Sequence, residues 1–246
     1  MNQIQLTPVV KRLLIANIVV WVVFQTLLEK LAGVPFSNYF AMTPKDVLFG
    51  YQLWQPFTYM FLHGGLWHLL LNMMMMVFIA PELENRWGPR FFTIFYVICG
   101  VGAGLFHILA TTLYASFSGV SVGLEIPVVG ASGALFGLMV SYAVLYGDRT
   151  IVVWPVPIPM QARVYVMILA GIQILGAISG EDSSQAFLVH LGGLIVGYIV
   201  LKLRGKMSGV GGGKKKFSFG QKKSGKKLRL VVDNDKNSKS EPKYWN

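Results

Sequence analysis

Two residues of the sequence have the side chains of a nucleophile and of a base, and each lies beside glycine. Ser132 lies in the segment GASG (130–133), and His190 lies in the segment VHLGG (189–193). A serine hydroxyl becomes a strong nucleophile when a neighbouring imidazole takes its proton, and the same imidazole can return that proton to a leaving amine. If the two segments meet in the fold, the pair predicts acyl-transfer chemistry.

Taken singly, Ser132 has a structural interpretation, because small residues let membrane helices approach closely. Glycines four residues apart follow both candidates, Gly133 and Gly137 after the serine, Gly193 and Gly197 after the histidine. Two such faces would bring their helices within reach of a serine–histidine hydrogen bond. The pair is therefore better explained by catalysis than by packing alone.

Further polar residues could complete a reaction site. His68 and Asn72 are four residues apart and so share one helix face. Together with the backbone N–H of Ser132, their side chains could stabilise an oxyanion, with Gly130 as an auxiliary residue of the same site. An ordinary interhelical hydrogen bond would explain His68 and Asn72 as well. Phe136, one turn after the serine, could pack on the imidazole of the base.

The remaining histidines and the acids give no metal site. His63 precedes two glycines and is interpreted as structural or water-retaining, and His107 as a satisfied interior histidine. The sequence has no HExxH motif, and no carboxylate shares the faces of the candidate residues. We therefore expect a Ser–His dyad rather than a triad, with no metal, nucleotide or other cofactor.

These residues must be positioned by membrane helices. Hydrophobic residues make up 54% of the 246 residues and charged residues 13%, about half the charge of a soluble domain. Cys99 is the only cysteine, which excludes a disulfide scaffold. Lipid demands that backbone groups bond within each segment, which favours an all-α, polytopic protein. Six spans are expected, at about 11–30, 64–81, 91–113, 128–147, 162–180 and 185–203.

The charges between the spans predict the orientation. Basic residues gather on one side, whereas the other side has Lys30 and Lys45 together with Glu125, Glu181 and Asp182. The positive-inside rule makes the basic side cytoplasmic and puts both termini there. The first span could alternatively be a cleaved signal peptide, but no clean cleavage site follows it.

The C-terminal tail is distinct from this membrane domain. Residues 202–246 contain 14 Lys or Arg and three acids, which accounts for the whole net charge of +11. We expect a membrane domain over 1–204 and a disordered, basic, cytoplasmic tail over 205–246. The tail could lie against anionic headgroups, and no fold motif suggests nucleic-acid binding.

Together these motifs resemble the rhomboid family of intramembrane serine proteases. The pattern is His63-x4-His68-x3-Asn72, then Glu84-x-Arg86, Gly130-x-Ser132-Gly133 and His190-x-x-Gly193-x-x-x-Gly197, over about residues 55–203. The resemblance implies a six-helix bundle, Ser132 as nucleophile, His190 as base, and an oxyanion site at His68, Asn72 and backbone N–H groups. It also implies structural roles for Glu84 and Arg86 and a partly embedded loop at about 31–60. A Trp-Arg pair found in many members is not evident there.

The resulting hypothesis is an endopeptidase that cleaves transmembrane protein substrates near the outer face of a membrane, most simply a bacterial inner membrane. The loop around Glu181–Gln185 would cover the site, and the weakly hydrophobic fifth span is a candidate gate. A non-proteolytic rhomboid-like protein that binds membrane clients is the main alternative. A transporter or channel is a third, disfavoured because the polar residues cluster toward one side.

Overall fold

The computed structural model describes residues 5–153, 156–178 and 184–208 of the chain. The predicted tail therefore lies outside the described residues, apart from its first four. Six apolar helices make up the body of the protein. They are α1 (Pro8–Val19), which continues as the π-helix η1 (Val20–Leu31), α5 (Leu66–Trp87), α6 (Pro89–Ser118), α7 (Ser132–Tyr146), α8 (Ala162–Ile178) and α9 (Ser184–Ser208).

Four of these helices are long and apolar enough to cross a membrane, and two are shorter. The long ones are α1 with η1, α5, α6 and α9, whereas α7 has 15 residues and α8 has 17. A crossing needs about 20 residues, so the expectation of six full-length spans is met by four. Large apolar side chains cover the outer surfaces of the helices, as lipid contact requires. The protein is an integral membrane protein.

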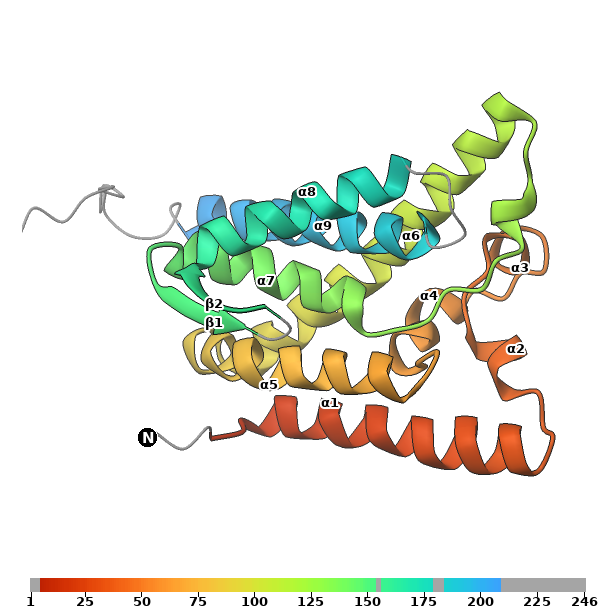
Figure 1. Ribbon diagram of the computed structural model, residues 1–246, viewed down its shortest axis with the longest axis horizontal. Helices are drawn as coiled ribbons and strands as arrows, with labels where there is room; N and C mark the ends of the chain where they lie inside the picture. Colours follow the sequence, from red (N-terminus) through yellow and green to blue (C-terminus); the bar gives the residue numbers. More distant parts are fainter. Residues whose placement is uncertain (1–4, 154–155, 179–183, 209–246) are drawn as a thin grey trace, which may run out of the picture.

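The short helix α7 is the centre of the bundle. It packs against α9, α6, α5 and α8, while α1 lies at the edge beside α5 (Figure 1). Ten of the residues of α7 are buried, so this helix is apolar all round rather than amphipathic. Its two ends therefore mark the two ends of the buried core.

Proline and glycine set the boundaries of several helices. Pro8 and Pro89 begin α1 and α6, where their missing N–H groups cost nothing. Gly88 separates α5 from α6 at a φ of 80°, and Gly119 ends α6 in the left-handed conformation. The 30 residues of α6 run well beyond the predicted span of 91–113, so this helix projects from the bundle (Figure 1).

The loop between the first two long helices is built from short helices near the start of α7. They are α2 (Phe36–Phe40), α3 (Pro44–Leu48), α4 (Gln55–Thr58) and the 3-10 turn η2 (Tyr59–Phe61). A further 3-10 turn, η3 (Val122–Leu124), follows α6. Trp54 donates its indole N–H to the carbonyl oxygen of Tyr39, 2.8 Å away, which ties two parts of this loop together.

One element departs from the all-α expectation. Strands β1 (Thr150–Val153) and β2 (Val156–Gln161) form an antiparallel hairpin between α7 and α8. Their residues are mostly β-branched or proline, which disfavours a helix. The hairpin lies at the same end of the bundle as the N-terminus (Figure 1).

Candidate active site

Ser132 and His190 lie within hydrogen-bonding distance of each other. Ser132 Oγ and His190 Nε2 are 2.8 Å apart, although 58 residues separate them in the chain. The serine is the first residue of α7, not four residues inside the helix as the predicted span of 128–147 implied. The histidine lies in the second turn of α9. The beginnings of two neighbouring helices therefore meet at this point.

Glycines bring α7 and α9 together. A Cβ on Gly193 would overlap the carbonyl oxygen of Gly133, and a Cβ on Gly197 would lie 2.6 Å from the Cα of Gly137. Real Cβ atoms do not approach backbone so closely, so only glycine fits at either position of α9. The Gly-x-x-x-Gly spacing thus allows backbone contact between the two helices.

Two more side chains hold the imidazole of His190. The ring of Phe136 stacks on it, with ring centroids 4.3 Å apart and planes 12° from parallel. On its other side, Gln173 Oε1 lies 2.8 Å from His190 Nδ1. A carbonyl oxygen only accepts, so this contact requires a proton on Nδ1 and leaves the lone pair of Nε2 facing Ser132.

Gln173 was not among the residues singled out from the sequence, where it counted only as a polar residue that weakens the fifth span. It is 4% exposed and is the only buried residue of α8 after Val166. A buried amide in an apolar helix needs a partner. That requirement is the signal that could have led to it.

Backbone N–H groups at the start of α7 are free of the helix ladder. The first residues of a helix have no intrahelical acceptor, and their amides carry partial positive charge. Ser132 and Gly133 are the first two residues of α7. Their N–H groups are thus suitable donors for an oxyanion next to the serine.

Gly130 lets the histidine of α5 approach this point. Its φ is +129°, which non-glycine residues rarely adopt, and a Cβ there would lie 2.8 Å from His68 Nε2. The N–H of Gly130 donates to the carbonyl oxygen of Tyr59 over 2.9 Å. His68 itself accepts at Nδ1 from the N–H of Gly64 over 3.3 Å. The structure therefore brings His68 next to the segment that leads into Ser132.

Asn72 is buried but makes a local contact. Its amide nitrogen donates to the carbonyl oxygen of His68, 3.0 Å away in the same helix. One hydrogen of the amide is committed to α5, and the second remains for another acceptor.

The backbone of His63 is held by the side chain of Gln25. Gln25 of η1 accepts from the N–H of His63 over 2.8 Å and donates to its carbonyl oxygen over 3.1 Å. Both ring nitrogens are buried without a hydrogen-bond partner among the described residues. Burial, with a smaller contribution from His68, lowers the pKa of His63 to about 3, so the ring stays neutral near pH 7.

The other predicted residues lie away from the serine. Glu84 accepts from the hydroxyl of Thr7 and from the N–H groups of Val9 and Val10, which caps the start of α1. Arg86 lies over the ring of Tyr146, 5.4 Å from its centroid. These contacts are at the opposite end of the bundle.

His107 of α6 is linked through Thr111 to Gln185 at the start of α9. His107 is fully buried in α6, with Nδ1 3.4 Å from the hydroxyl of Thr111. That hydroxyl donates to Gln185 Oε1 over 3.3 Å. Residues 181–183 of the loop expected around Glu181–Gln185 lie outside the described residues. Gln185 belongs to α9.

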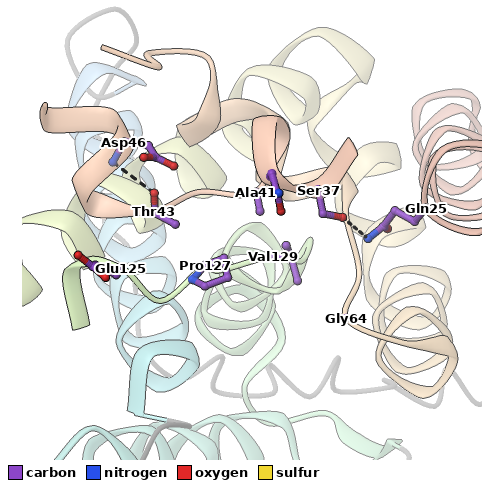
Figure 2. Close-up of a pocket in the computed structure, with 10 residues that line it drawn as sticks. Gln25, Ser37, Ala41, Thr43, Asp46, Gly64, Glu125, Pro127 and Val129 are labelled. Atoms are coloured by element: carbon purple, nitrogen blue, oxygen red, sulfur yellow. Dashed lines mark hydrogen bonds between the residues drawn. The ribbon is translucent and has the colours of Figure 1, made fainter. Parts of the chain in front are cut away.

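A cavity of about 480 Å³ is lined in part by residues close to His68 and Ser132 in the chain, although neither of these two residues lines it. Its lining includes Gly64, Val129, Ser37 and Gln25, and Figure 2 shows it between the loop helices and the segment that leads into α7. Gln25 Nε2 is 3.5 Å from Ser37 Oγ, one of the contacts drawn there. Over the described ranges, no group of three or more His, Cys, Asp or Glu side chains is arranged to hold a metal ion.

The sequence matches a known family model and several known proteins. The Rhomboid domain model matches residues 50–206. “Putative rhomboid protease YdcA” of Bacillus subtilis (strain 168) is 28% identical over 204 residues, which is 80% of this chain and 88% of that protein. “Rhomboid-like protease 3” of Toxoplasma gondii is 28% identical over 147 residues, 60% of this chain and 50% of that protein.

Other relatives match over shorter stretches. “RHOMBOID-like protein 1” of Arabidopsis thaliana is 35% identical over 99 residues, 40% of this chain and only 22% of that protein. “Inactive RHOMBOID-like protein 8” of the same plant is 27% identical over 89 residues, 36% of this chain and 22% of that protein. The chain thus spans well under two thirds of several relatives. Because the family model covers more than half of the chain, the protein belongs to the rhomboid family.

Proposed function

We propose that this protein is an intramembrane serine endopeptidase that cleaves transmembrane protein substrates. The observation that carries the proposal is the 2.8 Å contact between Ser132 Oγ and His190 Nε2. The names of two relatives as rhomboid proteases support it.

The contacts of the imidazole favour a defined proton path. The Nδ1–H of His190 donates a hydrogen bond to Gln173. His190 accepts the hydroxyl proton of Ser132 at Nε2 as Oγ attacks the substrate carbonyl carbon. The imidazolium then gives that proton to the leaving amine as the C–N bond breaks, which leaves an ester on Ser132. Water then hydrolyses the ester. His190 takes a proton from the water as its oxygen attacks the ester carbonyl carbon, and returns that proton to Ser132 Oγ as the ester C–O bond breaks and the carboxylic acid product is released.

The negative charge on the substrate oxygen requires donors that are already oriented. We assign this role to the N–H groups of Ser132 and Gly133 at the start of α7, with His68 and the free amide hydrogen of Asn72 as candidate side-chain donors. Gly130 belongs to the same arrangement because it gives His68 room to approach.

Water must reach the ester although the bundle sits in lipid. The 480 Å³ cavity beside Gly64 and Val129 has polar side chains such as Ser37 in its lining and has room for several water molecules at about 30 Å³ each. We propose that it supplies the hydrolytic water past Gly64 and Val129, which line it.

Charge distribution supports the orientation of the chain. The hairpin end carries Arg149 and Arg163, and the serine end carries the Lys45–Glu125 pair, 2.7 Å apart. The positive-inside rule would put the hairpin end and both termini in the cytoplasm. A substrate helix would then be cut near the outer face, where α8 is the candidate gate. We infer a plasma membrane of a bacterium as the simplest location.

The experiment is cleavage of a single-span test substrate with small residues near its outer end, in liposomes. Wild type is compared with Ser132→Ala, His190→Ala and Ser141→Ala, the last being a buried serine of the same helix whose hydroxyl bonds to Gly137. Cleavage by wild type and Ser141→Ala but by neither active-site variant is the expected result. Cleavage that persists in Ser132→Ala would remove the assigned nucleophile.

The client-binding alternative has one specific observation in its favour, the relative named as inactive. It predicts that wild type and Ser132→Ala bind membrane proteins equally and that neither cleaves any substrate.

A further inference from the structure

A second cavity lies at the end of the bundle opposite Ser132. Its volume is about 780 Å³. It is lined by the ends of α5, α7 and α9 and by the start of α8. Its charged lining residues are Arg86, Arg163, Lys202, Arg204 and Asp148.

Three of its four cations have no carboxylate partner within the part of the chain that the structure describes. Arg163 pairs with Asp148 over 2.9 Å. The other ion pairs of the described residues involve neither Arg86, Lys202 nor Arg204. The cavity therefore gathers uncompensated positive charge.

Aromatic rings support these three cations instead. Arg86 lies over Tyr146, with 5.4 Å between the guanidinium carbon and the ring centroid. Lys202 lies 4.7 Å from the ring centroid of Tyr198, and Arg204 lies 3.7 Å from that of Phe91. Such contacts hold a cation in place and leave its N–H groups free for an anion.

Arg204 is the clearest sign of a missing partner. Its Nη1 is buried and has no hydrogen-bond partner among the described residues. A buried guanidinium nitrogen without an acceptor is costly. An anion that reached this nitrogen would offset that cost.

The surroundings identify the kind of anion. Helix ends contribute only about half an elementary negative charge each, and the segment that follows α9 is itself basic. Trp87 and Tyr198 line the same cavity, and such side chains concentrate at the headgroup level of a bilayer. Arginine forks match phosphate oxygens in two-point contacts. The anion that best fits these surroundings is the phosphate of a lipid headgroup.

We propose that this cavity binds the phosphate headgroup of an anionic phospholipid, through Arg86, Lys202 and Arg204. The site stands independently of the catalytic proposal, because it uses none of the same residues. Basic pockets between membrane helices suit such headgroups on general electrostatic grounds.

The test is native mass spectrometry of the full chain in a neutral detergent, titrated with phosphatidylglycerol or phosphatidylcholine. We expect one phosphatidylglycerol to bind at least about fivefold more tightly than phosphatidylcholine. Arg204→Gln and Lys202→Gln should each weaken its binding roughly fivefold to tenfold, as loss of one hydrogen bond of average net strength should. Lys202 is exposed, so its variant should fold normally.

The control is Arg90→Gln, an exposed arginine at the start of α6 that does not line the cavity. It should change the affinity by less than about twofold. An equal loss in this control, or equal binding of the two lipids, would overturn the proposal. Displacement of the lipid by inorganic phosphate at matched concentration would overturn the lipid assignment in favour of a free phosphate.

Discussion

His190 is held by two helices that pack in different ways. Toward α7, the glycines at 133, 137, 193 and 197 bring backbone against backbone. Toward α8, the C-terminal half of that helix has one buried residue, Gln173, while neighbours such as Leu175 and Ile178 are more than 70% exposed. One contact of the imidazole is thus set by rigid backbone packing and the other by a single side chain.

This difference separates two requirements of the proposed chemistry. The distance from Ser132 to His190 depends on an interface that cannot widen without losing its packing. The protonation of Nδ1 depends on α8, which could move away to admit a substrate helix. Movement of α8 would therefore break the contact between Gln173 and His190 and keep the distance from Ser132 to His190.

Among changes to the surroundings of the Ser132–His190 pair, the largest effect is expected from Gly193→Ala. The added methyl group would overlap the carbonyl oxygen of Gly133 and push α9 from α7. We expect a loss of about 3 kcal/mol in the free energy of unfolding and a fall in kcat/KM of roughly 100-fold or more.

The matched control for that change is Gly171→Ala in α8, where a Cβ would meet nothing within 4 Å. It should leave activity unchanged and stabilise the helix by up to about 1 kcal/mol. Thermal unfolding and substrate cleavage measure both variants. Equal losses at the two positions would mean that the packing of α7 on α9 has no special role.

Gln173→Leu is expected to have the next largest effect. It removes the acceptor for Nδ1 and should lower kcat by roughly 10-fold to 100-fold, with KM changed by less than about twofold. Gln173→Glu keeps an acceptor at the same length and should recover most of kcat. A purely structural role would lower the stability of both variants and would not distinguish them.

Acid should destabilise the protein through His63. Its pKa is about 3 in the fold, below the unfolded value of 6.5, so the unfolded chain binds the proton first as the pH falls. Stability is lost between pH 6.5 and about 3, with roughly 2 kcal/mol lost from pH 7 to pH 5.

His63→Asn removes the titrating group and should flatten that dependence by the same amount. The measurement is the free energy of unfolding in detergent at pH 7 and pH 5 for both proteins. Equal acid sensitivity of the variant and the wild type would show that the ring is already solvated in the fold.

The smallest effect is expected from Phe136→Leu. Loss of the ring stacked on His190 should cost 0.5–1.5 kcal/mol, or about a twofold to tenfold fall in kcat. Phe95→Leu is the control, because Phe95 is also fully buried but packs against Trp87 away from the site. A fall in kcat as large in the control would attribute the effect to general packing.

Much of this arrangement could be predicted because its signals are local in sequence. Apolar runs predict helices, and glycines four residues apart predict the close contact of α7 with α9. The start of α7 was placed four residues early because residues 128–131 are nearly as apolar as the helix. Their non-helical path is set in part by the pairing of Val128 with Met42, a long-range contact.

Two other features could not be predicted because they too depend on contacts between different parts of the chain. Gln173 gains its significance only from a neighbour 17 residues away, which no periodicity encodes. Arg86 is far in the chain from Lys202 and Arg204, with which it lines the second cavity, and each alone is an ordinary basic residue at a helix end.

The most direct test of the serine–histidine chemistry is labelling of the lipid-reconstituted protein with a fluorophosphonate, mapped by mass spectrometry. A base-activated serine should form one adduct on Ser132, and His190→Ala should abolish it while the fold is retained. No adduct on folded wild type, or an adduct on another serine, would contradict the assignment of Ser132 as the nucleophile.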